Sequence, residues 1–462
     1  MNKRVLGSFR DPSGFLFLKD NILYRQVNNA YKHDYEQLIT SGLYERLTKS
    51  KAMVSHVEDE IHLSPEPDLV YKVIKPEIID FISYPYEWCF SQLKEAALLT
   101  LAIAKRSLKY GMTLKDASAY NVQFHNGRAI FIDSLSFKAY KEGEPWVAYK
   151  QFCQHFLAPL SLMVYRDIRL NKLLQIYIDG LPLDLTSKLL PFKTKLNFGT
   201  LSHIHLHAKS QARYANQPID KDELQASISL TAHERLLENL ISTVKALHPK
   251  KIQMEWTEYY QNTNYSSQAF ETKKHIISSF ISQTNPKTVW DLGANTGEFS
   301  RIASDQGIMT VAFDIDPGAV TQNYKILKEK KEKYILPLIM DLTNPSPSIG
   351  WCHQERSSLI GRGPADLVLA LALIHHLAIS NNVPLISVAD FLARLSQFLI
   401  IEFVPKSDSQ VKRLLLTRED IFSNYSEKGF EEAFSQLYKI LDKRNVDSSE
   451  RILYLMEKKI RG

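Results

Sequence analysis

The sequence is poor in cysteine and has no apolar run long enough to span a bilayer. Its three cysteines, Cys89, Cys153 and Cys352, are too far apart to predict a disulfide framework or a zinc cluster, so we expect three small buried residues. The longest apolar run, residues 365–379, is shorter than the roughly 20 residues of a spanning helix and is interrupted by His375 and His376. We therefore expect no membrane insertion and read this run as a buried strand.

Repeats, low-complexity segments and a strong charge excess are also missing. The first residues carry charges but no apolar core of a secretory signal, so we expect a cytoplasmic protein. The net charge of +6 is small for 462 residues, and the basic runs 248–251 and 328–333 are short. Solvated helix faces account for such runs better than nucleic-acid binding does. The composition, 44% hydrophobic and 23% charged, is that of a globular protein with two or three domains.

The C-terminal half alternates short apolar runs with helical patterns, which predicts βαβ units and a mainly parallel sheet. After a last helix at 431–440, two further β-like runs predict a closing hairpin, with 451–459 as the final strand. The expected strands are 287–293, 309–316, 335–342, 365–373 and 398–404, and the expected helices are 297–307, 317–333 and 387–397.

Residues 289–301, "VWDLGANTGEFSR", pass from a buried strand to a polar helix through a glycine-containing bend. Asp291, Gly293, Asn295 and Gly297 follow the pattern D-x-G-x-N-x-G, in which small residues let a ligand approach the backbone and the free N–H groups of the helix start. About 20 residues later a second strand ends in an acid, at the position where such folds bind a ribose, and a third strand ends likewise. These two acids are Asp314 and Asp341.

Over residues 252–462 the chain resembles the class I S-adenosylmethionine-dependent methyltransferases. The resemblance implies that residues 293–297 lie against the methionine part of the cofactor, with Asp291 holding its amino group. Asp314 would accept both ribose hydroxyls, and Asp341 and the Leu342 N–H would bind the adenine. The implied cofactor-binding set is Asp291, Gly293, Ala294, Asn295, Gly297, Asp314, Ile315, Asp341 and Leu342. The alternative is a Rossmann-like sheet that binds another nucleotide, or whose acids only cap helices.

Methyl transfer from a sulfonium needs an acceptor held in line and, for a hydroxyl, a base. The candidate catalytic residues are His375 and His376, after the fourth strand, and Glu402, at the end of the fifth. The sequence N/D-P-P-Y/F is absent from this site, which favours an oxygen acceptor over an amide or base nitrogen. Residues 256–270 precede the first strand, and we expect a lid there that includes Tyr260, Asn264 and Tyr265.

The N-terminal half predicts a strand hairpin at 14–27, a helix over 31–49, a long helix over 90–111 and a strand over 129–137. Asp116 and Asn121 form D-x-x-x-x-N, and Asp133 follows twelve residues later. Over residues 10–200 this resembles protein-kinase-like and aminoglycoside-phosphotransferase-like folds. The resemblance implies that Asp116 orients an attacking hydroxyl and that Asn121 and Asp133 hold magnesium on the phosphates of ATP.

Two departures from the kinase pattern weaken that implication. The hairpin carries only "DPSG" and no glycine-rich loop, and Arg25 stands where kinases have a phosphate-binding lysine. Glu36 is placed to pair with Arg25. A turn-forming Asp and Asn in a hairpin region is the alternative interpretation.

Histidines recur at every second position in "HIHLHAK", at His203, His205 and His207. On a strand all three would share one face. With no cysteine or acid at ligand spacing, an ordinary sheet surface is the better interpretation than zinc.

We predict an α+β kinase-like domain (1–200), a helical extension and linker (201–250) and an α/β, Rossmann-like class I methyltransferase domain (251–462). Blocks such as "SYPYEW" and "LKDASAYN" are similar to those of uncharacterised and nodulation-associated bacterial methyltransferases. The expected reaction is methyl transfer from S-adenosylmethionine to an oxygen of a small-molecule or glycan acceptor.

Two hypotheses for the N-terminal half stay open. It is either an active, ATP- and magnesium-dependent phosphotransferase on the same acceptor, as in O-antigen-capping kinase/methyltransferases with reversed domain order, or a binding module. A third hypothesis for the whole chain, an RNA methyltransferase with an accessory domain, predicts binding that weakens steeply with salt.

Overall fold

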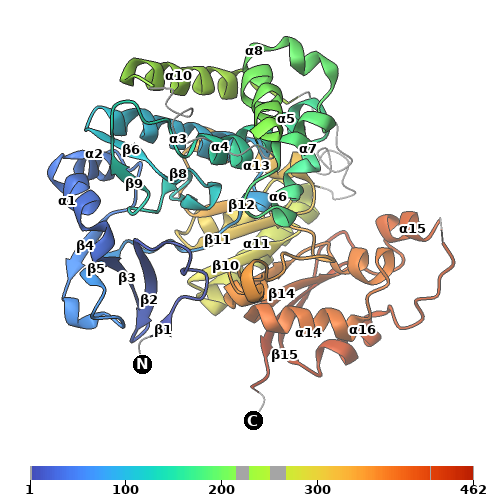
Figure 1. The fold of residues 1–462 in the computed structure, drawn as a ribbon. Helices are drawn as coiled ribbons and strands as arrows, with labels where there is room; N and C mark the ends of the chain where they lie inside the picture. The colour runs from blue at the N-terminus through green and yellow to red at the C-terminus, as the bar shows by residue number, and fades with distance from the viewer. Residues whose placement is uncertain (1–2, 215–227, 250–266, 417, 461–462) are drawn as a thin grey trace. The chain divides into compact units, whose positions relative to one another are not determined.

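The computed structural model describes residues 3–214, 228–249, 267–416 and 418–460 (Figure 1). Its chain divides into two units, one made of residues 1–252 and 349–356 and the other of 253–348 and 357–462. The expected lid residues Tyr260, Asn264 and Tyr265 lie outside the described residues. Within the described part, no helix has the length and apolar character needed to cross a membrane.

The first unit begins with a five-stranded antiparallel sheet in the order β1-β2-β3-β5-β4. The predicted hairpin is confirmed, because β2 and β3 pair directly and Asp20 and Asn21 form the turn with positive φ angles of 52° and 61°. Such angles give the turn the twist that two-residue hairpins favour. The strands are β1 (Lys3–Arg4), β2 (Gly14–Lys19), β3 (Ile22–Asn28), β4 (His56–Asp59) and β5 (Val70–Pro76).

The single helix predicted over 31–49 is wrong, because the chain forms α1 (Lys32–Thr40) and α2 (Leu43–Lys49). Gly42 separates them with a φ of 82°, a conformation that glycine adopts without steric cost. The long helix is confirmed as α3 (Phe90–Leu108), and Gly111 with a φ of 68° follows its end.

Two short sheets flank the residues Asp116, Asn121 and Asp133, which lie in the connections between their strands. One sheet pairs β6 (Met112–Leu114) with β9 (Phe137–Ala139), and the other pairs β7 (Val122–His125) with β8 (Arg128–Phe131). The prediction of one strand over 129–137 is therefore wrong. Asp133 lies in the loop between β8 and β9, not at a strand end.

The rest of the first unit is helical, as predicted, where the structure describes it. His203, His205 and His207 do not share a strand face: residues Leu201–Leu206 form a π-helical turn that leads into α9 (His207–Tyr214). The other helices are α4 (Tyr149–Phe152), α5 (Ala158–Tyr165), α6 (Leu173–Ile176), α7 (Leu183–Leu189), α8 (Phe198–Thr200) and α10 (Leu230–Ala246).

Residues 349–356 belong to the first unit although they come from between two strands of the second. The Glu355 carboxylate accepts hydrogen bonds from the Arg10 guanidinium, and the Arg356 guanidinium lies 4.0 Å from the centre of the Tyr120 ring. Cys352 is exposed in this segment, so the prediction of three buried cysteines is wrong for one of them. Cys89 and Cys153 are buried as expected.

The second unit is built on a seven-stranded sheet in the order β12-β11-β10-β13-β14-β16-β15. All pairs from β12 to β14 are parallel, whereas β16 is antiparallel to both β14 and β15. The mainly parallel sheet and its closing hairpin are thus confirmed. The strands are β10 (Thr288–Leu292), β11 (Met309–Asp314), β12 (Ile335–Ile339), β13 (Ala365–Ala370), β14 (Ser396–Phe403), β15 (Tyr438–Asn445) and β16 (Ile452–Lys458).

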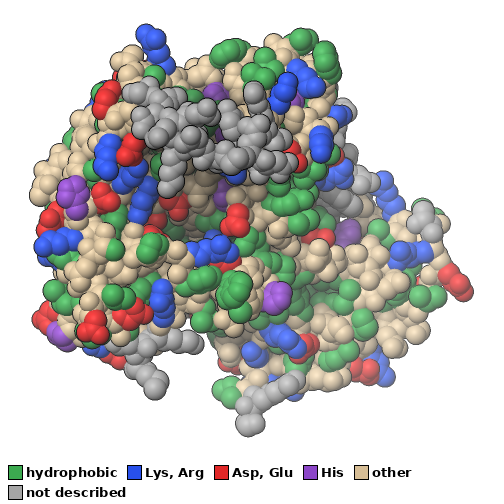
Figure 2. Space-filling view, viewed as in Figure 1, with side chains coloured by type: hydrophobic (Ala, Val, Ile, Leu, Met, Phe, Trp, Pro, Cys, Tyr) green, Lys and Arg blue, Asp and Glu red, His purple; other side chains and the backbone are tan. Residues whose placement is uncertain are grey.

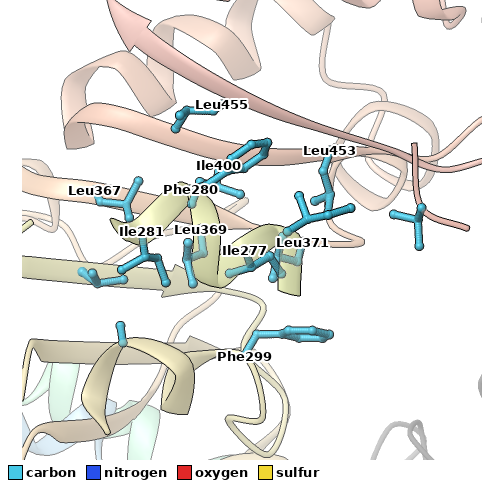
Figure 3. Packing of buried hydrophobic residues seen from close by; sticks show 14 of the residues in the cluster. Ile277, Phe280, Ile281, Phe299, Leu367, Leu369, Leu371, Ile400, Leu453 and Leu455 are labelled. Carbon is cyan, nitrogen blue, oxygen red and sulfur yellow. The ribbon is translucent and has the colours of Figure 1, made fainter. Parts of the chain in front are cut away.

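Helices cover both faces of this sheet. On one face, Ile277, Phe280 and Ile281 of α11 pack against alternate residues of β13, β14 and β16 (Figure 3). On the other face, the ring of Tyr454 lies 5.0 Å from that of Phe430 on α16, as expected for a residue between Leu453 and Leu455 on a pleated strand. The helices are α11 (Ser267–Thr284), α12 (Ser300–Ser304), α13 (Pro317–Lys330), α14 (Leu385–Leu395), α15 (Ser409–Leu415) and α16 (Glu427–Phe434).

The predicted last helix over 431–440 is wrong in its second half, since α16 ends at Phe434 and β15 starts at Tyr438. Phe434 and Tyr438 are four residues apart, a helical spacing, whereas Tyr438 and Ile440 are two apart, a strand spacing, so the pattern over this short stretch is ambiguous.

Candidate functional site

A cavity of about 250 Å³ opens at the C-terminal ends of β10 to β13 in the second unit. This is the edge where ligands bind in parallel α/β sheets. Nine residues predicted for the site line it: Asp291, Gly293, Ala294, Asn295, Asp314, Ile315, Asp341, Leu342 and His376. Three others, Gly297, His375 and Glu402, are not among its lining residues.

The bend after β10 brings backbone to the cavity surface. Gly293 and Asn295 have positive φ angles of 80° and 48°, and the N–H groups of Gly293 and Ala294 both donate to the Phe313 carbonyl at 2.9 Å. This fixes the loop against β11. Gly297 has a different reason to be glycine, because a Cβ there would lie 2.5 Å from the side-chain amide nitrogen of Asn323 on α13.

Asp314 ends β11 with its carboxylate fixed by backbone donors. The Asn295 N–H donates to Oδ2 at 2.7 Å and the Asp316 N–H donates to Oδ1 at 2.8 Å. Burial raises the pKa of Asp314 to about 6, although these hydrogen bonds favour the ionised form.

Asp291 ends β10 and is 1% exposed. Its Oδ2 accepts a hydrogen bond from the Ser300 hydroxyl at 2.6 Å. Burial, with a smaller contribution from the charge of Asp314, raises the pKa of Asp291 to about 7. A ligand cation beside a carboxylate that is so shielded from water would strongly stabilise its ionised form.

Asp341 and Leu342 follow β12 on the opposite side of Asp314 from Asp291. The Asp341 Oδ1 accepts hydrogen bonds from the backbone N–H of Thr343 at 2.8 Å and from its hydroxyl at 2.6 Å. The three acids therefore stand at the tips of three neighbouring strands around one cavity, as the sequence predicted.

The two predicted histidines differ in their surroundings. His375 is fully buried, and neither of its ring nitrogens has a hydrogen-bond partner among the described residues. Burial together with the charge of His376 lowers its pKa well below the usual value. His376 lines the cavity, and its pKa is also lowered by burial, so it is neutral near pH 7. Of the pair, only His376 reaches the cavity.

Glu402 is buried behind the cavity wall. Its Oε2 accepts hydrogen bonds from the Lys273 ammonium and from the Ala372 N–H, each at 2.7 Å. Lys273 lines the cavity, although its side chain is only 2% exposed, and lies 4.5 Å from the centre of the Phe299 ring. Ala372 has a positive φ of 49°. The structure thus places Glu402 as a support for cavity-lining residues.

A smaller cavity of about 110 Å³ lies in the first unit and brings together Arg25, Asn121 and Asp133, as predicted. Asp116 is not one of its lining residues. Burial and the negative charge of Asp133 raise the pKa of Asp116. The predicted pairing of Glu36 with Arg25 is wrong: Glu36 accepts a hydrogen bond from the Tyr71 hydroxyl at 2.7 Å, and Arg25 binds Asp133.

The histidines of residues 203–207 serve the packing of helices. His203 bonds the Tyr149 hydroxyl at 2.7 Å and the Asn239 side-chain oxygen at 2.6 Å. His205 bonds Ser187 and Thr194 at 2.7 and 2.9 Å. Across the described ranges, no group of three or more His, Cys, Asp or Glu residues could hold a metal ion.

Charges of both signs are interspersed on the face of the molecule seen in Figure 2. The Lys and Arg side chains on this face do not form one continuous basic patch. A protein that binds the phosphates of a nucleic acid usually presents a continuous basic patch.

One curated relative matches the chain over nearly its whole length. The nodulation protein NoeA of Rhizobium meliloti (strain 1021) is 37% identical over 464 residues, which cover 98% of this chain and 96% of the relative. The chain belongs to the NoeA family. No protein-family model matches it.

Two solved structures each match less than half of this chain. Magnesium protoporphyrin IX methyltransferase (ChlM) from Synechocystis PCC 6803, with bound SAH, is 14% identical and covers 44% of this chain and 93% of its own, with a TM-score of 0.32. The bifunctional kinase-methyltransferase WbdD is 16% identical and covers 45% of this chain and 43% of its own, with a TM-score of 0.30.

Several cavity residues of this NoeA-family member were missed by sequence reasoning. Their side chains are mostly apolar and lie on α11 or in loops, where no spacing pattern marks them. They are Phe270, Lys273, Phe299, Met340, Thr343, Leu371, Ala372, Leu373, Leu377 and Asn381.

Proposed function

We propose that the second unit binds S-adenosylmethionine and transfers its methyl group to an oxygen of a small-molecule or glycan acceptor. The observation that carries this proposal is the set of Asp291, Asp314 and Asp341 at three successive strand tips, lining one cavity. The sheet order, with an antiparallel strand inserted next to β14, is the one that the sequence resemblance to class I methyltransferases implies.

The donor set fits the cofactor. Asp291 is a buried carboxylate whose raised pKa would fall again beside an ammonium group. Asp314 presents both oxygens from a fixed position, which suits a pair of ribose hydroxyls. The apolar lining residues Met340, Leu342 and Leu371 suit a flat base and a thioether chain. When bound, the cofactor supplies a methyl group that is already activated.

Catalysis then requires protein residues that orient the acceptor and accept its proton. His376 is the proposed base, because it lines the cavity and is neutral near pH 7, so that a ring nitrogen can accept a proton from a hydroxyl. In this proposal the first unit presents the acceptor.

Isothermal titration calorimetry with S-adenosylhomocysteine tests the cofactor assignment on the full chain. We expect one site per chain with a dissociation constant in the micromolar range, which corresponds to about 8 kcal/mol. Absence of heat with both S-adenosylmethionine and S-adenosylhomocysteine, on folded protein, would exclude the function. Tritiated S-adenosylmethionine with fractionated lysate, with and without ATP, then identifies the acceptor class.

Cofactor affinity is expected to depend on pH through Asp291. Its pKa of about 7 in the free protein means that lowering the pH from 8 to 6 protonates the carboxyl that would hold the ammonium group. Below the pKa, affinity should fall by up to tenfold per pH unit, since binding must then release a proton. Above about pH 8 an α-amino group itself loses its proton.

Calorimetry across this pH range should therefore give maximal affinity between about pH 7 and 8. Asp291→Asn is the matched control. It should bind the cofactor weakly, and its affinity should not change as the pH falls below the pKa of Asp291. If the affinity of this variant fell at low pH as steeply as that of the wild type, the role of Asp291 would be contradicted.

A further inference from the structure

The Arg25–Asp133 ion pair in the first unit bears on the metal that the kinase-like resemblance implies. The Arg25 Nη1 lies 2.5 Å from the Asp133 Oδ1. Both side chains are largely buried, with exposed fractions of 14% and 13%. A guanidinium is always charged. Arg25 therefore places a permanent cation beside Asp133, the residue that would have to bind magnesium.

Asp133 accepts two further hydrogen bonds from the protein. Its Oδ1 also accepts from the Leu135 N–H at 3.0 Å, and its Oδ2 accepts from the Ser136 hydroxyl at 2.5 Å. The carboxylate thus meets three donors of the protein, the Arg25 guanidinium, the Leu135 N–H and the Ser136 hydroxyl.

The side chain of the second implied metal ligand, Asn121, is held through its nitrogen. The side-chain nitrogen of Asn121 donates to the Ser136 hydroxyl at 3.1 Å, which is the same hydroxyl that donates to Asp133. Magnesium requires near-octahedral oxygen ligands at about 2.0–2.1 Å and sheds its waters reluctantly. As they stand, these residues do not fit a magnesium ion, because it would have to displace the guanidinium.

The remaining surroundings do not offer another metal position. The cavity walls are mainly apolar, with Leu16, Val54, Ile74, Pro76 and Ile132 beside the polar residues. His56, which also lines the cavity, has its pKa lowered to about 4 by burial, and its Nε2 lies 3.1 Å from the Tyr35 hydroxyl. A volume of about 110 Å³ is also small for a nucleoside triphosphate.

We infer that the Arg25 guanidinium takes the place of a divalent cation at Asp133, so that the cavity of the first unit binds its ligand without metal. Between the two hypotheses for this unit, the geometry therefore favours the metal-free binding module over the magnesium-dependent phosphotransferase. The inference rests on the proposed acceptor-presenting role of the unit and not on methyl transfer.

Manganese binding to the full chain tests the inference directly, because Mn²⁺ is paramagnetic and replaces magnesium at oxygen sites. Titration followed by electron paramagnetic resonance should give the same number of bound ions for the wild-type chain and for Asp133→Asn, with and without ATP. A site at millimolar or tighter affinity that the wild type has and Asp133→Asn lacks would overturn the inference.

A gain-of-site variant tests the stand-in role of the guanidinium. Arg25→Met removes the charge and keeps much of the side-chain length, so it should acquire one Mn²⁺ site that Arg25→Met/Asp133→Asn lacks. Arg25→Lys keeps a cation and should acquire none. A folded Arg25→Met chain without a new site would contradict the inference.

Should Arg25→Met fail to fold, the comparison of wild type with Asp133→Asn still decides, because neither protein carries that change. Calorimetry of the wild type with S-adenosylhomocysteine reports on the second unit alone. Its outcome therefore separates failure of the methyltransferase proposal from failure of the metal-free inference.

Discussion

Asp314→Ala is expected to weaken binding of S-adenosylhomocysteine by about 100-fold or more. The change removes a charged acceptor for two ribose hydroxyls, and hydrogen bonds to charged groups contribute about 1.5–3 kcal/mol each. It also strips the Asn295 and Asp316 N–H groups of their partner, and these hold the loop next to the cofactor. Calorimetry against the wild-type chain measures the loss.

Asp316→Asn is the matched control for this change. Asp316 is a buried acid two residues away that accepts a hydrogen bond from the Gly318 N–H at 2.6 Å and caps α13. Asparagine caps helices equally well, so affinity should change little. Equal affinity of Asp314→Ala and wild type would show that the cavity does not recognise a ribose at β11.

The acids of the second unit were predictable because each directly follows an apolar run. In a parallel sheet the ends of such runs meet at one edge, so Asp291, Asp314 and Asp341 come together without any knowledge of tertiary contacts. The bend at 293–297 was predictable for a similar local reason, since two glycines and an asparagine favour positive φ.

Lys273 shows what the sequence could not reveal. It stands next to Lys274 on the same helix, and the composition around the two is the same for both. Only the packing of α11 places Lys273 against the cavity with Glu402, while Lys274 lies within 3.6 Å of Glu271 and 3.9 Å of Glu298 nearer the surface. The helical phase of α11 fixes this difference.

In the first unit, likewise, the sequence did not reveal which charged residues form ion pairs. The sequence placed Arg25 on a strand and Asp133 after another, but which acid the arginine meets depends on how β3 packs against the loop after β8. Residues 349–356 were equally hidden, because nothing in their composition indicates that Glu355 binds Arg10, 345 positions earlier.

Lys273→Met is expected to destabilise the second unit by about 3–5 kcal/mol, because it leaves the Glu402 carboxylate buried without its cation. Arg451, whose Nη1 lies 3.8 Å from the Glu402 Oε1, offsets part of the loss. Lys274→Met is the control and should change the free energy of unfolding by less than about 0.5 kcal/mol. Urea unfolding of the three proteins measures the difference.

Glu402→Gln completes a double-mutant cycle and separates the predicted catalytic role from the supporting one. If Glu402 supports the cavity wall through Lys273 and the Ala372 N–H, the double variant Lys273→Met/Glu402→Gln should be more stable than the sum of the single losses predicts. Its cofactor affinity should recover in parallel, because the glutamine amide oxygen can still accept from the Ala372 N–H and carries no unpaired charge. A Glu402→Gln chain that keeps wild-type stability and cofactor affinity, yet loses methyl transfer, would instead assign the proton transfer to Glu402 and remove His376 from that role.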